Sequence, residues 1–107
     1  MTDLNLKIIK SYGFPETITR PDHDDISLSI ELPNGLELSC LTVCCNELCE
    51  CDTLYGFDDF LEVKSKERLD ELIAMTYEQI VNEVAMKNDK FVLLLTARYE
   101  TKKNHKQ

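Results

Sequence analysis

Apolar and polar residues alternate most regularly in the two segments on either side of a Pro-Asn-Gly turn. Every second side chain in residues 26–32 is apolar, which is typical of a strand with one buried face. A two-residue Asn-Gly loop would place Leu32 opposite Glu37, whereas a three-residue loop forms one continuous apolar face. The pairs of that second arrangement are Leu32–Leu36, Ile30–Leu38 and Leu28–Cys40. We therefore expect a hairpin whose second strand covers 36–44, with Gly35 in a left-handed conformation.

Weaker patterns predict the neighbouring strands and loops. Residues 3–11 alternate weakly and predict a first strand, and the polar residues 16–25 predict an exposed loop. The segment 46–53 fits either a loop or a short edge strand. Residues 55–57, Tyr-Gly-Phe, predict a turn.

One long helix and one central strand are predicted for the last part of the chain. Side chains at helical spacing form a stripe between Lys64 and Asn88. They are Leu69, Leu72, Ile73, Thr76, Tyr77, Ile80 and Val84. Ser65 is suited to be the N-cap, and Asn88 can end the helix. Residues 91–95 are apolar without interruption, which favours a strand in the middle of the sheet.

These elements together predict a small α+β domain. Residues 1–101 form its single unit, a mostly antiparallel sheet of about four to five strands with one long helix packed across a face. Residues 102–107 are predicted to be a flexible basic tail.

Charge is distributed unevenly along the 107 residues. The net charge is −8. Residues 21–63 carry −11 and contain no Lys or Arg, whereas 1–20 carry +1 and 64–107 carry +2. Such an acidic segment repels nucleic acid, whose binding requires cationic side chains, and attracts a cationic partner. A solvated surface kept soluble by its charge is the alternative interpretation.

The first residues of the chain and the number of cysteines predict the cellular compartment. The start of the chain has no basic flank followed by an apolar run, and no segment approaches the about 18 apolar residues of a membrane span. Five cysteines cannot all pair within one chain. We expect a cytoplasmic protein, without membrane association, whose cysteines are free thiols.

All five cysteines fall within residues 40–51, and two explanations compete for them. Cys40 and Cys44 continue the apolar face of the hairpin, because cysteine is a small apolar residue that buries readily. The main prediction is therefore structural thiols and no cofactor. The alternative is a zinc site, for which the ligands would be Cys44, Cys45, Cys49 and Cys51.

The sequence predicts no enzymatic activity. Acidic residues interleave with the thiols and raise the pKa of a cysteine, whereas a nucleophilic cysteine needs a lowered pKa. His23 lies among carboxylates with no positioned nucleophile, and there is no glycine-rich phosphate loop.

The function expected from size, charge and compartment is that of a small acidic inhibitor. It would bind a basic protein, such as a nuclease toxin or a nucleic-acid-binding effector, in the manner of an immunity or anti-defence protein. The partner-binding residues predicted for toxin neutralisation are Asp22, Asp24, Asp25, Glu47, Glu50, Asp52, Tyr55, Asp58 and Asp59. The rings of Tyr55, Phe57 and Phe60 are suited equally to binding and to anchoring the loop on the core.

Two other classes of protein fit the same sequence. One is a zinc-stabilised structural or regulatory module held by the cysteines. The other is a subunit that self-associates through an open sheet edge, for which the hairpin is the candidate. The oligomeric state is not predicted.

Overall fold

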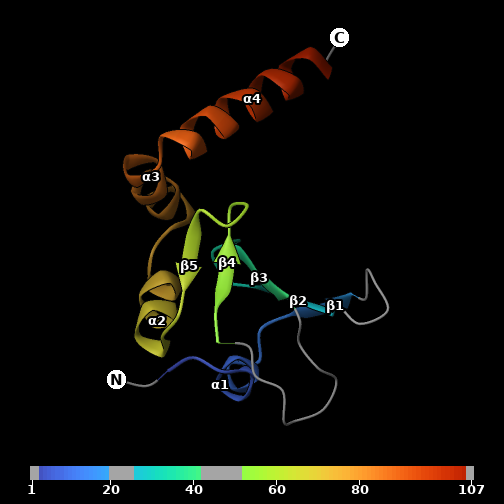
Figure 1. Cartoon of the computed structure of the whole chain (residues 1–107), viewed down its shortest axis with the longest axis vertical. Helices are drawn as coiled ribbons and strands as arrows, with labels where there is room; N and C mark the ends of the chain where they lie inside the picture. Colours follow the sequence, from blue (N-terminus) through green and yellow to red (C-terminus); the bar gives the residue numbers. More distant parts are fainter. Residues whose placement is uncertain (1–2, 20–25, 42–51, 106–107) are drawn as a thin grey trace.

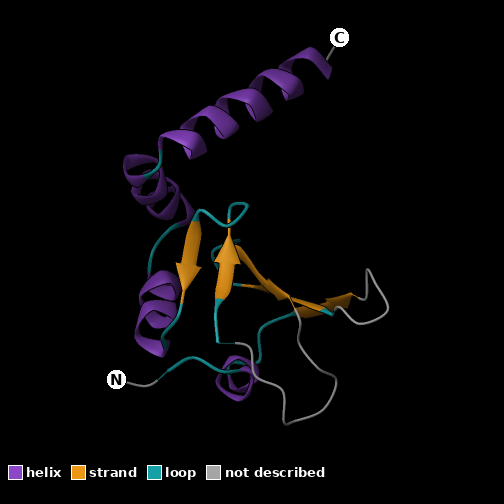
Figure 2. Cartoon of the chain, in the orientation of Figure 1, coloured by secondary structure: helices purple, strands orange, loops and turns teal. Residues whose placement is uncertain are grey.

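The computed structural model describes residues 3–19, 26–41 and 52–105, with side chains up to residue 97. Figure 1 shows these elements along the chain, and Figure 2 distinguishes helices from strands. The helices are α1 (Leu6–Ser11), α2 (Lys66–Ala74), α3 (Tyr77–Lys87) and α4 (Asp89–His105). The strands are β1 (Glu16–Thr19), β2 (Ser27–Glu31), β3 (Glu37–Leu41), β4 (Leu54–Gly56) and β5 (Leu61–Val63). The predicted α+β class is confirmed.

The five strands form one antiparallel sheet in the order in which they occur along the chain, β1-β2-β3-β4-β5. The hairpin of β2 and β3 has the predicted register, with Ile30 opposite Leu38 and Leu28 opposite Cys40. The Leu32 amide donates to the Leu36 carbonyl at 2.9 Å and closes the three-residue loop. Gly35 has a φ of 93°, the left-handed conformation that this turn requires.

Only one face of the sheet is buried. In β2, β3, β4 and β5, buried side chains alternate with exposed or half-buried ones. Their buried side chains join those of α1, α2 and α3 in a single core. The other face of the sheet carries the remaining side chains of the strands, and we call it the open face.

The first two predictions along the chain are wrong. Residues 3–11 were expected as a strand, but they contain α1, because the Asn5 side chain caps the helix by accepting from the Ile8 amide at 3.0 Å. Leu6 and Ile9 then face the core at helical spacing. Residues 16–19, expected as loop, form β1 by pairing with β2, although all four side chains are exposed. Backbone pairing with β2, and not burial of side chains, therefore accounts for the formation of this edge strand.

The predicted long helix is interrupted. Ser65 caps α2 as expected, but α2 ends before Met75 and Thr76, where the backbone is extended. Thr76 begins α3 with a capping box: its hydroxyl accepts from the Gln79 amide at 3.1 Å, and its own amide donates to the Gln79 side chain at 2.9 Å. Asn88 is the C-cap of α3, so the predicted end of the helical region of 64–88 is confirmed.

The prediction of a final strand in the middle of the sheet is also wrong. Residues 91–95 lie in α4, so the middle of the sheet is β3 and not a final strand. Leu, Ala and Arg all favour helices, and a short apolar run does not by itself separate strand from helix. Figure 1 shows α4 leading away from the sheet. Residues 55–57 were expected as a turn, but Tyr55 and Gly56 belong to β4, and the turn follows at 57–60.

Candidate partner-binding groove

The open face is hollowed above β3 and β4. Two cavities, of about 550 and about 600 Å³, share Ser39, Tyr55 and Asp59 and form one continuous depression. Ser39 and Tyr55 are direct cross-strand partners, so the two strands build the floor together. We call this depression the acidic groove. Its polar lining is Glu37, Ser39, Asp52, Thr53, Tyr55, Asp58, Asp59 and Tyr77.

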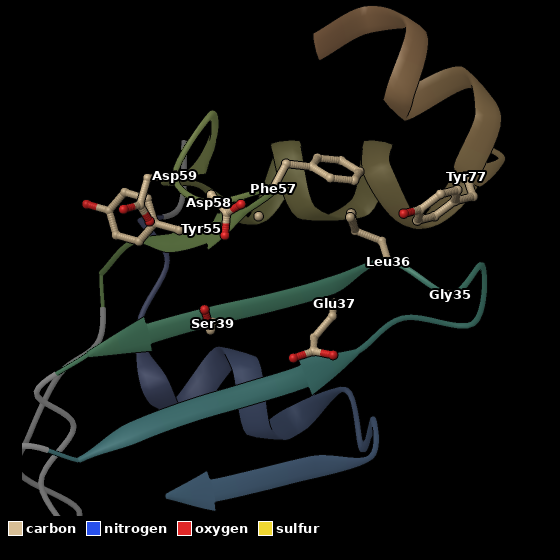
Figure 3. A pocket seen from close by; sticks show the side chains of 10 residues that line it. Gly35, Leu36, Glu37, Ser39, Tyr55, Phe57, Asp58, Asp59 and Tyr77 are labelled. Carbon is tan, nitrogen blue, oxygen red and sulfur yellow. The ribbon is translucent and has the colours of Figure 1, made fainter. Parts of the chain in front are cut away.

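Negative charge dominates the lining of the acidic groove. Figure 3 shows Glu37 and Ser39 on β3 below Asp58 and Asp59 of the β4–β5 turn. Among the described residues that line the two cavities, none is Lys, Arg or His. Lys64 lines a neighbouring cavity, which shares Asp52 with the acidic groove, so the uninterrupted acidic lining ends there.

A pair of like charges lies where β3 pairs with β2. Glu31 and Glu37 are direct cross-strand partners, and both side chains are exposed. Like charges placed directly opposite one another destabilise a sheet. A cationic ligand over this part of the open face would relieve that repulsion.

Two cations of α2 pair with carboxylates that do not line the groove. Lys66 pairs with Asp70 at 2.9 Å, and Arg68 pairs with both Glu71 and Glu83. These side chains belong to α2 and α3, which contribute to the core on the covered side of the sheet. The pKa of Asp70 is lowered by a hydrogen bond from the Tyr12 hydroxyl and, as the second cause, by a hydrogen bond from Lys66. The ion pairs therefore leave the charge of the acidic groove in place.

The turn between β4 and β5 has an unusual backbone. Phe57, Asp58 and Asp59 have φ values of 52°, 55° and 74°, in the left-handed region that non-glycine residues rarely adopt. Aspartate tolerates this region better than most residues, whereas a phenylalanine there needs support from its surroundings. The result is that two carboxylates are exposed side by side at the rim of the acidic groove.

Aromatic contacts supply the support that this turn needs. The Phe57 ring lies 5.0 Å from the Phe91 ring and 5.9 Å from the Tyr77 ring, and Phe60 lies 5.7 Å from Phe91. Phe91 is fully buried. Phe57 and Phe60 therefore anchor the turn, while Tyr55 is half-buried and lines the groove. Phe57 also lines the first cavity, so this ring both anchors the turn and borders the groove.

Asn34 and Tyr77 complete the end of the groove nearest α3. The Asn34 amide donates to the carbonyls of Leu72 and Met75, both at 2.8 Å, and so ties the hairpin turn to the end of α2. This brings Gly35 and Leu36 beside Tyr77, the first residue of α3. Tyr77 was assigned to the apolar stripe, but its side chain is 45% exposed. The Thr-x-x-Gln capping box at 76–79 is the signal that would have placed it at a helix start.

The structure brings together four of the predicted partner-binding residues, Asp52, Tyr55, Asp58 and Asp59. Glu37 lies off the apolar face of the predicted hairpin register, but it was not predicted as part of the site. The other predicted residues, Asp22, Asp24, Asp25, Glu47 and Glu50, lie outside the described residues.

The cysteine predictions are tested only at one position. Cys40 is buried on the apolar face, as predicted, but it is disulfide-bonded, so the expectation of a free thiol is wrong there. Cys44, Cys45, Cys49 and Cys51, the ligands of the alternative zinc site, lie outside the described residues. Within 3–19, 26–41 and 52–105, no group of three or more His, Cys, Asp or Glu side chains could hold a metal ion.

Comparison with known proteins does not assign the chain to a family. No family model matches it, and no curated protein or solved structure is significantly similar. None of the helices in the described part of the chain has the length and hydropathy to cross a lipid bilayer. The fold and the groove define a small α+β domain with an acidic open sheet face.

Proposed function

We propose that this protein is a non-catalytic acidic inhibitor that binds a basic protein through the acidic groove. The observation that carries this proposal is the lining itself: Glu37, Asp52, Asp58 and Asp59 line the groove together with two tyrosines, with no cation among the described lining residues. Complementary charge accelerates capture of a cationic surface and selects against acidic partners.

The groove is suited to a protein ligand in shape as well as in charge. Tyr55 and Tyr77 supply rigid apolar area with a polar end, which is common at the centre of protein interfaces. The strained turn fixes Asp58 and Asp59 before binding, so little conformational entropy is lost when they meet a cation.

The partner class follows from the negative charge that lines the groove. A nuclease toxin or a nucleic-acid-binding effector has a cationic site that contacts successive phosphates. Carboxylates along the acidic groove would occupy that site in place of phosphates and block it. The proposal places the inhibitor in the cytoplasm, where such an effector meets its nucleic acid.

The absence of catalysis is part of the same proposal. The titratable side chains of the described lining are carboxylates and tyrosines. Nucleophilic catalysis by Ser39 would need a base beside its hydroxyl, and Ser39 has no histidine or lysine among the described lining residues.

A comparison of two charge-matched variants tests the proposal. The groove variant combines Glu37→Gln, Asp52→Asn and Asp59→Asn, since asparagine keeps the left-handed preference at position 59. The control variant combines Glu16→Gln, Glu67→Gln and Glu78→Gln, which removes the same charge from exposed positions outside the groove. Wild type and both variants would serve as baits in lysate of the native host at low and moderate salt.

We expect wild type and control to capture the same basic protein, and the groove variant to bind it at least about tenfold more weakly. The purified partner's nucleic-acid binding or cleavage should then be inhibited by wild type and by the control. Equal capture by all three baits, or a captured protein that is acidic, would reject the groove as the binding site.

A further inference from the structure

The strand β1 is an edge of the sheet and pairs on one side only among the described strands. It stands at the end of the strand order, and Figure 1 shows it on the side of the sheet away from α2 and α3. All four of its side chains are exposed. The β2–β3 hairpin, which was expected to supply an open edge, lies between β1 and β4, so both of its strands are already paired on both sides.

The backbone groups of Glu16 and Ile18 point toward the open edge of β1. The Glu31 amide donates to the Pro15 carbonyl at 3.1 Å, which is a bonded pair of the β1–β2 ladder. Bonded and non-bonded pairs alternate along an antiparallel ladder, so Pro15 and every second residue after it bond to β2. The amides and carbonyls of Glu16 and Ile18, which lie between these positions, therefore point away from β2.

This geometry restricts how two copies of β1 can pair. Outward groups must face outward groups, so the two-fold axis of an antiparallel pair passes through a residue and not between two residues. With Glu16 on the axis, two carboxylates would face each other. With Thr17 on the axis, Glu16 would face Ile18 of the second copy.

The register with Ile18 on the axis matches like side chains with like. The two Ile18 side chains face each other, and Thr17 faces Thr19 of the second copy on both sides of the axis. Threonine pairs across strands stabilise a sheet, whereas like charges opposite one another destabilise it. Continued by one residue, the same register sets Glu16 against position 20, which is an arginine in the sequence. The residues of β1 are therefore complementary to a second copy of themselves.

The surroundings of Ile18 favour the same register. Ile18 is 54% exposed, although its cross-strand partner on β2 is Leu28, which is fully buried. Leu28 is in turn opposite the buried Cys40 on β3. A second Ile18 placed against the first would extend this apolar row across the axis and remove apolar surface from water.

We propose that β1 pairs with β1 of a second copy of this chain, antiparallel and with Ile18 on the two-fold axis, so that the two sheets become one. Pro15 has no amide hydrogen to donate and ends the pairing on its side. An interface of two short strands is smaller than the about 1,000 Å² of a stable complex, so the dimer is weak and forms over the micromolar to millimolar range. It does not rest on the proposed function, since no residue of β1 lines the acidic groove.

Sedimentation velocity of the purified protein tests the dimer, from about 1 μM to about 1 mM. Wild type should shift from monomer toward twice the monomer mass. Ile18→Lys should raise the dissociation constant at least about tenfold, because it sets two lysines opposite each other on the axis. Leu41→Lys is the matched control, since Leu41 is also an exposed apolar residue but lies on the interior strand β3; it should dimerise like wild type. Circular dichroism would verify that both variants are folded.

Amide hydrogen exchange of wild type, followed by NMR, locates the pairing and needs no variant. The Ile18 amide should exchange more slowly at high than at low protein concentration, because it donates to the Ile18 carbonyl of the second copy. The amides of β5, at the other end of the sheet, should exchange at the same rate at both concentrations. The proposal would be overturned by a wild-type protein that stays monomeric, by an Ile18→Lys variant that dimerises like wild type, or by a dimer in which the Ile18 amide is not protected.

Discussion

At the scale of single residues, Asn34 links the hairpin to the helices. Its amide group satisfies two carbonyls at the end of α2, and its oxygen accepts from the Leu36 amide at 3.0 Å. Helix ends leave carbonyls without partners, so a half-buried side chain in this position has a direct effect on stability. It also fixes one end of the acidic groove.

We predict that Asn34→Asp destabilises the protein by about 1–3 kcal/mol. Aspartate keeps the acceptor for Leu36 but cannot donate to the two carbonyls, and its charge is unfavourable at a helix C-terminus. Urea unfolding of wild type and variant measures the change. Asn82→Asp, an exposed substitution on α3, is the control and should change stability by less than about 0.5 kcal/mol. Equal losses in both would contradict the role given to Asn34.

Glu83 makes the stability of the fold depend on pH. Burial raises the pKa of Glu83, but the hydrogen bonds from Arg68 and Lys87 outweigh it, so that the net pKa is lowered. Because the folded state favours the charged form, the stabilisation is present above the pKa of the unfolded chain. It is lost as the pH falls through the lower pKa of the folded state.

We therefore predict that Glu83→Gln lowers stability at neutral pH and makes stability less sensitive to acid. Denaturant unfolding at neutral pH and at acidic pH, below the usual range of glutamate, would measure the difference between wild type and variant. Glu78→Gln, an exposed change on the same helix, should keep the wild-type dependence. If Glu83→Gln loses stability with acid as steeply as wild type does, the ion pair with Arg68 is not the cause.

At the scale of elements, the sequence predicted what depends on local patterns. The β2–β3 hairpin was predicted with its register because alternation and turn chemistry agree there. The break between α2 and α3 was missed because helical spacing continues across it. Its causes are the capping box at Thr76 and the hydrogen bonds from Asn34, which is 38 residues from Leu72 in sequence. Contacts between distant residues are not visible in a local pattern.

The helix α4 shows the same limit. Residues 91–95 are apolar throughout, and neither length nor periodicity distinguishes a buried strand from the start of a helix. The tertiary environment decides: Phe91 is enclosed by the rings of Phe57 and Phe60, and the next residues, Val92 and Leu93, are exposed. A central strand would have buried all of them.

We predict that Phe91→Ala destabilises the protein by about 3–5 kcal/mol, because it removes the fully buried ring that anchors both α4 and the β4–β5 turn. Leu93→Ala should cost less than about 0.5 kcal/mol, because this side chain is mostly exposed. Urea unfolding of the two variants measures both values. Similar losses in the two would contradict the placement of α4.

At the scale of the whole molecule, charge was the most useful signal in the sequence. The acidic excess of 21–63 anticipated an acidic surface, and Asp52, Tyr55, Asp58 and Asp59 do meet in one groove. The contribution of Tyr77 could not be predicted, since it depends on where α3 begins relative to the hairpin. Glu37 could have been added, because the hairpin register already placed it on the open face.

The most direct test of the account is to map where a cationic ligand binds. A lysine-rich peptide would be titrated into isotope-labelled protein at low and moderate salt, and amide chemical shifts would be followed by NMR. We predict salt-sensitive changes concentrated at Glu37, Ser39, Tyr55, Asp58, Asp59 and Tyr77, with little change along α2. Changes centred on α2, or no changes at low salt, would contradict the proposal that the acidic groove is the binding site.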